Sequence, residues 1–266
     1  MNSPTNRNLM YMERIVVRML EVCVDSLASA RAAVAGGSDR LELCSALAVG
    51  GLTPYVQLLR QLRQETDIPV RCLMRPRAGD FLYTREELDM MAEQILVLRQ
   101  SGAEGFVLGC LDAQGNLDAA AMAPLLEAAK GAGLTLHRCI DVSRDPEACY
   151  RDAWALGFDT VLTSGAAASC TNGKSVLSRL LTLQAQGGPT VLIGSGVNAG
   201  VIRELRRELP SAESFHMSGK QDIPSGMLFR RENVPMGIPG LDEWHIARTS
   251  EAAVRAAKEA LREALS

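Results

Sequence analysis

The chain has 266 residues and a formal net charge of −3; 47% of its residues are hydrophobic and 22% are charged. These proportions are typical of a soluble globular protein, and a pI near 5.7 gives no basic surface for nucleic acid or anionic lipid. No apolar run approaches the roughly 18 residues that cross a membrane. We therefore expect neither a nucleic acid nor a membrane as a partner.

Residues 1–12 are polar and lack the apolar core of a signal peptide, so we expect a flexible leader and a cytoplasmic protein. The seven cysteines are odd in number and include no Cys-x-x-Cys pair, which argues against a disulfide framework. Cys72, Cys110 and Cys139 lie within apolar runs, where a thiol packs as a small hydrophobe.

Short apolar runs alternate with longer amphipathic stretches along the whole chain. The predicted strands are Val16–Cys23, Arg40–Cys44, Val70–Arg75, Gly105–Cys110, Thr135–Cys139, Thr160–Thr163, Thr190–Gly194 and Ser214–Ser218. The predicted helices between them are Leu27–Ala35, Tyr55–Gln64, Arg85–Ser101, Asp118–Gly131, Pro146–Leu156, Lys174–Ala185 and Ala199–Leu209, and a last helix covers 250–265.

Eight repeats of strand and helix predict an α/β fold, a (β/α)₈ TIM-like barrel formed as a single domain by residues 13–266. An open doubly wound sheet is the alternative, because the number of strands does not establish closure. Residues 220–244 carry three prolines and three glycines without a helical period, which predicts an irregular loop. Such a loop is often a lid or a binding loop, and the alternative is a surface excursion or an oligomer contact.

Two predicted strands end alike, in Leu20-Glu21-Val22-Cys23 and Leu41-Glu42-Leu43-Cys44. Side chains two apart in a strand share a face, so each strand presents a carboxylate and a thiol together. If Cys23 and Cys44 are neighbours, they could hold Cu(I) with two sulfurs; zinc would need further ligands such as His137 or His216. Alternatively, the two thiols fill the barrel.

A second set of polar residues at the predicted strand ends suits a small anionic metabolite. Arg75 and Arg77 could clamp an anion, and Ser164, Gly194, Ser195, Gly196 and Ser218 could cradle a phosphate or carboxylate group. In such an enzyme, the candidate general acids and bases are Glu21, Glu42, His137 and His216. The alternative is a structural ion network that pairs Arg75 and Arg77 with Glu21, Glu42 and Asp80.

Several motifs resemble those of the CutC copper-homeostasis family, in the same order along the chain. They are Glu21-Val22-Cys23-Val24-Asp25-Ser26, the run 36–44 ending Arg40-Leu41-Glu42-Leu43-Cys44, Gly50-Gly51-Leu52-Thr53-Pro54, the run 75–83 starting Arg75-Pro76-Arg77, His137-Arg138-Cys139-Ile140-Asp141 and Leu162-Thr163-Ser164-Gly165.

The resemblance implies a TIM-like barrel, a cytoplasmic location, self-association into a homo-oligomer and binding of Cu(I) in copper homeostasis. It places the proposed copper ligands at Cys23 and Cys44. The chain departs from the usual family pattern at Ala78, Leu136, Cys139, Ile140, Ser195 and Met217. None of these departures affects Glu21, Cys23, Glu42, Cys44, Arg75 or His137.

Overall fold

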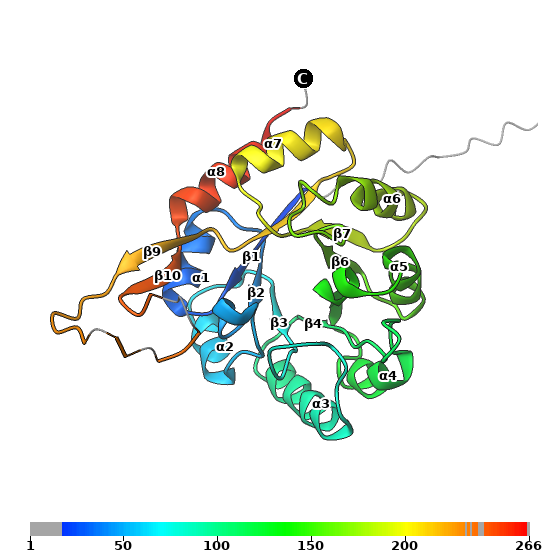
Figure 1. The fold of residues 1–266 in the computed structure, drawn as a ribbon, viewed down its shortest axis with the longest axis horizontal. Helices are drawn as coiled ribbons and strands as arrows, with labels where there is room; N and C mark the ends of the chain where they lie inside the picture. The colour runs from blue at the N-terminus through cyan, green and yellow to red at the C-terminus, as the bar shows by residue number, and fades with distance from the viewer. Residues whose placement is uncertain (1–17, 232, 235, 239–241, 265–266) are drawn as a thin grey trace, which may run out of the picture.

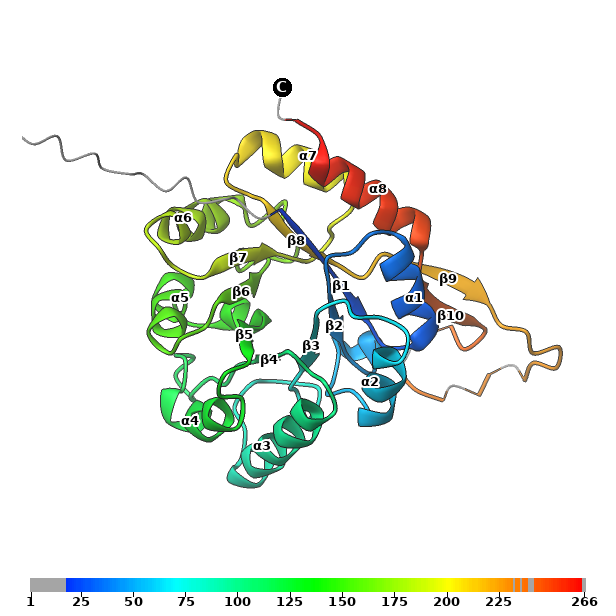
Figure 2. The ribbon, with the colours of Figure 1, turned by 180° about the vertical axis from the view of Figure 1, so that it is seen from behind.

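The structure is a computed structural model that describes residues 18–231, 233–234, 236–238 and 242–264. The predicted leader 1–12 and positions 16–17 of the first predicted strand lie outside the described residues. Eight parallel strands form a ring, and helices surround it (Figures 1 and 2). The strands are β1 (Met19–Val24), β2 (Arg40–Leu43), β3 (Val70–Leu73), β4 (Gly105–Leu108), β5 (Gly133–Leu136), β6 (Thr160–Thr163), β7 (Thr190–Ile193) and β8 (Ser214–Met217).

The ring is closed because β1 pairs in parallel with β2 on one side and with β8 on the other. This pairing confirms the TIM barrel and excludes the open sheet. The surrounding helices are α1 (Leu27–Ala35), α2 (Val56–Arg63), α3 (Arg85–Gln100), α4 (Ala119–Ala128), α5 (Pro146–Ala155), α6 (Lys174–Ala185), α7 (Ala199–Glu208) and α8 (Glu251–Arg262). In the described part of the chain, no helix is long and apolar enough to cross a membrane.

Side-chain capping fixes where several helices begin. Thr84 and Glu87 form a capping box at α3, in which each side chain accepts a hydrogen bond from the other residue's backbone N–H. Asp145 caps α5, and Pro146 occupies the first helical position, where its missing N–H costs nothing. These local signals explain why the predicted helix starts agree with the structure within a few residues.

Two predicted segments differ from the structure. β5 runs over 133–136 and not 135–139, because the His137 side chain accepts a hydrogen bond from the Cys139 N–H and turns the chain into a short 3₁₀ helix, η2 (Arg138–Val142). The segment predicted to be irregular starts with a strand, β9 (Lys220–Pro224), which pairs antiparallel with β10 (His245–Thr249). This hairpin and the described residues between its strands (225–231, 233–234, 236–238 and 242–244) form an arm that projects from the barrel beside α1 (Figures 1 and 2).

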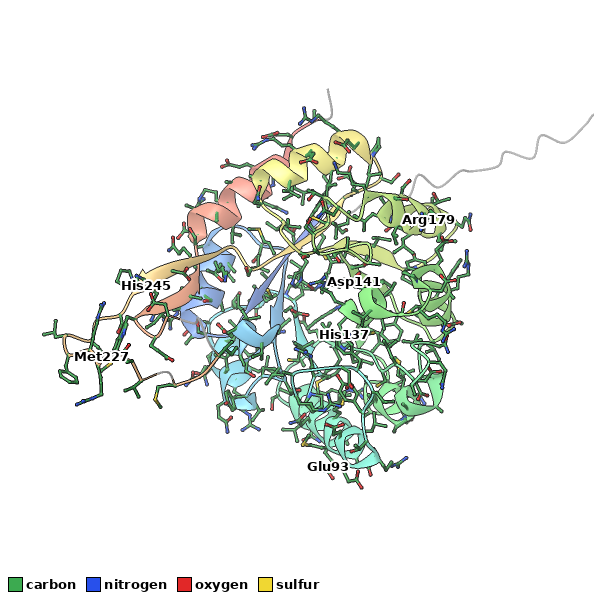
Figure 3. The ribbon with its side chains drawn as sticks, viewed as in Figure 1. Glu93, His137, Asp141, Arg179, Met227 and His245 are labelled. Atoms are coloured by element: carbon green, nitrogen blue, oxygen red, sulfur yellow. The ribbon has the colours of Figure 1, made fainter. Side chains whose placement is uncertain are left out.

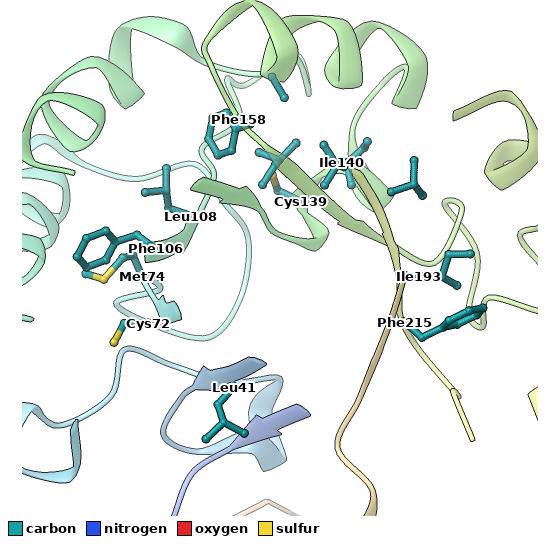
Figure 4. Packing of buried hydrophobic residues seen from close by; sticks show 14 of the residues in the cluster. Leu41, Cys72, Met74, Phe106, Leu108, Cys139, Ile140, Phe158, Ile193 and Phe215 are labelled. Atoms are coloured by element: carbon teal, nitrogen blue, oxygen red, sulfur yellow. The ribbon is translucent and has the colours of Figure 1, made fainter. Parts of the chain in front are cut away.

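The strand residues alternate between two buried regions. Leu20, Val22, Leu41 and their counterparts on other strands face the helices and join the main apolar core, part of which Figure 4 shows. The opposite face points into the barrel, where Cys23, Cys44, Leu73 and Val107 form a small separate cluster. Burial on both faces explains why parallel strands carry almost unbroken apolar runs.

Arg71 lies across the interior at the start of β3. Its guanidinium donates to Thr135 Oγ1 (2.6 Å) and pairs with Asp159 (2.7 Å) across the sheet. Gly105 and Gly133 provide the room: a Cβ at either position would lie within 2.8 Å of the Arg71 side chain. The Arg71 guanidinium thus occupies the amino-terminal end of the barrel, next to β4 and β5.

Candidate functional site

The register of β8, β1 and β2 assembles a charged cluster inside the barrel. Glu21 pairs in register with His216 on β8 and with Arg40 on β2. The Glu21 side chain is fully buried; its Oε1 accepts from His216 Nδ1 at 2.8 Å and its Oε2 forms an ion pair with Arg40 Nε. Two cationic partners therefore compensate the burial of this carboxylate.

Glu42 lies on the other side of the same imidazole. Its Oε2 is 3.8 Å from His216 Nε2, and it accepts a hydrogen bond from the Cys44 thiol at 3.3 Å. His216 is thus held between two carboxylates, one at each ring nitrogen. The thiol proton of Cys44 already points to a carboxylate that could receive it.

The pKa values in the cluster follow from burial and these partners. Burial would raise the pKa of Glu21, but Arg40 and His216 lower it to about 2. Burial raises the pKa of Glu42, and the negative charge of Glu21 adds to the effect. Burial alone would lower the pKa of His216, but Cys23 and Glu21 outweigh this effect and raise the pKa well above its ordinary value. Glu21 and His216 are therefore a charged pair at neutral pH.

The two candidate thiols differ in their surroundings. Burial and the neighbouring Glu42 raise the pKa of Cys44 well above that of a free thiol. Cys23 lies beside the backbone carbonyl of Met217, which its sulfur approaches to 3.6 Å. Ligand atoms of Cys23, Glu42 and His216 all lie within 4.8 Å of one another. That separation is close to twice a metal–ligand bond of about 2.0–2.3 Å, so a small inward movement would let one ion contact all three.

The donor atoms of this group are one sulfur, one nitrogen and one oxygen, a set that fits a d¹⁰ metal ion. Cys44 is outside this group, but it shares the interior cluster with Cys23 and is bonded to Glu42. The structure thus brings Glu21, Cys23, Glu42, Cys44 and His216 together. We did not expect from the sequence that Glu42 and His216 would adjoin Cys23 more directly than Cys44 does.

His137 lies apart from this cluster: no hydrogen bond or ion pair joins the two within the described ranges. It lies at the carboxyl end of β5, near Asp141 in Figure 3, and its ring contacts Phe81 with the ring centroids 4.7 Å apart. Burial and the nearby Arg75 lower the pKa of His137 to about 3. Because its Nδ1 accepts from Cys139, the neutral ring carries its proton on Nε2, and this buried atom has no partner among the described residues.

Both predicted anion-binding arginines bind loop groups. Arg75 Nη1 donates to the carbonyls of Val49 (2.9 Å) and Gly51 (3.0 Å), whereas its buried Nε has no partner among the described residues. Arg77 pairs with Glu87 at 2.6 Å and Asp80 at 3.0 Å. Of the two, Arg75 is the one with a buried donor that lacks a partner among the described residues.

The predicted serine and glycine cradle is likewise bonded within the protein. Ser164 donates from its N–H and its hydroxyl to Asp141, a carboxylate that also binds Thr163 Oγ1 (2.5 Å) and Arg138 (2.7 Å). Ser195 Oγ donates to the Ala168 carbonyl at 2.9 Å, in a left-handed turn with φ of 74°. Gly194 and Gly196 flank that turn, and the Ser218 carbonyl accepts from Thr249 in β10. The sequence showed Asp141 in the His137 motif, but it did not show that Asp141 would join η2 to the end of β6.

Comparison with known proteins identifies the family. Residues 18–221 match the model of the CutC family. The chain is 41% identical over 249 residues to the family protein CutC of Vibrio parahaemolyticus, covering 93% of this chain and all of that one. It is 42% identical over 244 residues to the family protein CutC of Chromobacterium violaceum, covering 92% and 98%.

Solved structures agree with this assignment. The crystal structure of CutC from Streptococcus agalactiae, a proposed copper-homeostasis protein, superposes with a TM-score of 0.71 at 28% identity and covers 76% of this chain and 99% of that one. Phosphoribosyl anthranilate isomerase from Thermococcus kodakaraensis superposes with a TM-score of 0.54 at 15% identity, covering 93% of this chain and all of that one, and shares the fold alone. The chain therefore belongs to the CutC family.

Proposed function

We propose that this CutC-family protein acts in copper homeostasis by binding one Cu(I) ion through Cys23 and Cys44, with His216 as a neighbouring donor. The observation that carries the proposal is the grouping of the Cys23, Glu42 and His216 ligand atoms within 4.8 Å, with the Cys44 thiol bonded to the same Glu42. Thiolate and imidazole are ligands that suit Cu(I). The description of the Streptococcus agalactiae relative as a proposed copper-homeostasis protein supports the choice of copper.

Glu42 has a specific part in this proposal. The Cys44 proton must leave before the sulfur binds a metal, and the thiol already donates to Glu42. Because burial raises the pKa of Glu42, its carboxylate is a competent acceptor for that proton. Transfer of the Cys44 proton to Glu42 would leave a thiolate beside a neutral carboxylic acid, and the charge of this thiolate would be balanced by Cu(I). Cys23 and His216 would each release a proton to solvent before they could bind the ion.

An anaerobic Cu(I) competition titration tests the proposal. We expect about one copper per chain with the wild type, and loss of tight binding in the Cys23→Ser/Cys44→Ser double variant. Cys149→Ser is the matched control, because Cys149 is equally buried but lies on α5 in the outer core. Binding that is weak, or that the double variant retains, would contradict the copper function; Zn(II) binding that needs Cys23 but not Cys44 would assign the site to zinc.

A cytoplasmic location is part of the proposal. All seven cysteines are buried and unpaired, which is the state expected of thiols in a reducing compartment. We also expect a homo-oligomer, since the arm exposes apolar side chains, among them Met227, Leu228, Phe229 and Met236. Light scattering at several protein concentrations tests self-association, and a monomer at all concentrations would contradict it.

A second candidate function is an enzyme that acts on a small anionic metabolite. It is favoured by the two unpartnered buried donors, His137 Nε2 and Arg75 Nε, whose side chains both contact Phe81. In this reading Glu21, Glu42 and His216 move protons, and His137 donates a hydrogen bond. Thermal stabilisation by anionic metabolites that Arg75→Ala abolishes and Arg77→Ala preserves would support it; stabilisation indifferent to Arg75 would exclude it.

A further inference from the structure

The arm concentrates much of the exposed apolar surface of the protein. Among the described residues, seven of the fourteen large apolar side chains that are exposed belong to it. They are Met227, Leu228, Phe229, Val234, Met236, Ile238 and Ile246. Its strands, β9 and β10, form a sheet of two strands, and most of their residues are exposed. A two-stranded ribbon on its own is only marginally stable in water, so the arm needs a surface to pack on.

The tip of the arm is also cationic. Arg230 lies over the ring of Trp244, and Arg231 lies over the ring of Phe229, each 5.5 Å from the ring centroid. Within the described ranges, neither guanidinium forms an ion pair with a carboxylate. Methionine, aromatic residues and arginine are enriched at interfaces between proteins. The arm therefore has the composition of a surface that binds another protein chain.

A second exposed apolar surface lies on α3. Outside the arm, four of the seven exposed large apolar side chains in the described part of the chain lie on this helix or just before it. They are Leu82, Met90, Leu96 and Val97. The remaining three are single residues on three different segments. The exposed apolar surface is thus concentrated in two places, the arm and α3.

The same face of α3 is acidic. Spacings of four, three and four residues put Glu86, Met90, Glu93 and Val97 on one stripe of the helix. All four residues are exposed, and Figure 3 shows Glu93 at the outer edge of the molecule. No ion pair within the described ranges involves Glu86 or Glu93. This stripe alternates carboxylates with apolar side chains, and it is complementary to the apolar and cationic tip of the arm.

The arrangement of the helices lets two copies exchange their arms. In Figures 1 and 2 the arm extends away from the ring and lies apart from α3, and α2 lies between the two. Because the arm and α3 flank α2, a two-fold axis that runs beside α2, parallel to the barrel axis, places the arm of each copy against α3 of the other. Two-fold dimers are the commonest homo-oligomers, and such a dimer contains this contact twice.

We propose that the arm docks on α3 of a second copy of this chain, in a reciprocal two-fold dimer. The apolar side chains of the tip pack on the apolar residues of the α3 stripe, and Arg230 and Arg231 pair with Glu86 and Glu93 of the other copy. Ion pairs of this kind fix the register of an interface whose apolar contacts are not directional. The inference rests on the homo-oligomer proposed above, but not on copper binding, because neither surface includes a copper ligand.

Sedimentation velocity of the full-length protein over a range of concentrations tests the inference. We expect the wild type to dimerise. Phe229→Asp on the arm and Val97→Asp on α3 should each weaken dimerisation about a hundredfold or more, because a carboxylate enters an apolar contact twice per dimer. Val142→Asp is the matched control: Val142 is an exposed valine on η2, outside both surfaces, and its replacement should leave the dimer unchanged.

Mixing the two variants identifies the surface that receives the arm. A dimer of one Phe229→Asp chain and one Val97→Asp chain keeps one intact contact between an arm and α3. An equimolar mixture should therefore associate more tightly than either variant alone.

Charge reversal gives a second test, which decides the matter if either aspartate variant does not fold. Arg230→Glu/Arg231→Glu should weaken dimerisation about tenfold or more, because like charges then face each other across the interface. Adding Glu86→Arg/Glu93→Arg to the same chain should recover most of this loss.

Several results would overturn the inference. A dimer that Phe229→Asp disrupts and Val97→Asp preserves would exclude α3 as the receiving surface and keep the homo-oligomer. A wild type that is monomeric at all concentrations would refute both. Equal weakening by Val142→Asp, or charge reversal without recovery, would also exclude the contact. The Cys23→Ser/Cys44→Ser variant should dimerise like the wild type, which separates this test from that of the copper function.

Discussion

Two buried histidines of the barrel, His137 and His216, have opposite pKa shifts because their neighbours differ in charge. His137 is 4% exposed and His216 is 9% exposed, yet the pKa of His137 falls to about 3 while that of His216 rises well above 6.5. His216 has a carboxylate at each ring nitrogen, whereas His137 is next to the cation Arg75 and the ring of Phe81. Burial favours the neutral form of both rings, and the charged neighbours decide why only His216 keeps its proton.

The largest effect should follow from removing the carboxylate that holds His216. Glu21→Gln leaves the buried Arg40 and His216 without their shared anion, and we expect a loss of about 3–5 kcal/mol in the free energy of unfolding. Urea denaturation measures it. Glu93→Gln is the control, because Glu93 is an exposed carboxylate on α3 and should change stability by less than about 0.5 kcal/mol. A loss below about 1 kcal/mol in Glu21→Gln would show that the ion network adds little to stability.

The neutral state of His137 should appear as a pH dependence of stability. Its pKa is about 3 in the folded protein and 6.5 in the unfolded chain, so between these values only the unfolded chain binds the proton. Stability due to this group is therefore complete above pH 6.5 and falls as the pH falls. From pH 6.5 to about 4.5 the loss should be about 2–3 kcal/mol, since each pKa unit corresponds to about 1.4 kcal/mol.

His137→Gln isolates this contribution, because the amide oxygen of glutamine can still accept from the Cys139 N–H but does not titrate. We expect urea midpoints of the variant to fall less than those of the wild type over the same pH range. Parallel pH profiles of the two proteins would mean that the pKa of His137 is not lowered in the folded state. Glu21 does not interfere above pH 4.5, because its pKa of about 2 makes its contribution fall only at lower pH.

A smaller effect on stability should follow from replacing Phe81, whose ring contacts both His137 and Arg75. Phe81 contacts the His137 ring and lies under the Arg75 guanidinium, 5.5 Å from the ring centroid. Phe81→Leu should therefore reduce stability by about 1 kcal/mol. Tyr55→Leu, which removes an exposed aromatic ring just before α2, is the control and should have no measurable effect. Equal values for the two variants would show that the ring only fills space.

Much of the fold could be predicted because it depends on local patterns. Alternation of apolar strands with amphipathic helices, and caps such as Thr84 and Asp145, specify elements through contacts only a few residues apart. The antiparallel pair of Lys220–Pro224 with His245–Thr249 escaped this reasoning, because its partners are separated by a long stretch of turn residues. The 3₁₀ helix after β5 also escaped, since it depends on where the His137 side chain accepts its hydrogen bond.

The strands of the barrel and the kinds of side chain on their inner face could be predicted from the sequence, because both follow from a period of two along each strand. Which of these side chains meet depends on how distant strands pair. Closure of β8 onto β1 places His216 against Glu21, 195 positions away in the chain, and thereby builds the cluster around Cys23 and Glu42. Packing between distant segments likewise decides that Arg75 donates to a loop carbonyl and that Arg77 pairs with a carboxylate. The same packing forms a pocket that Arg40 lines, and no local pattern encodes these contacts.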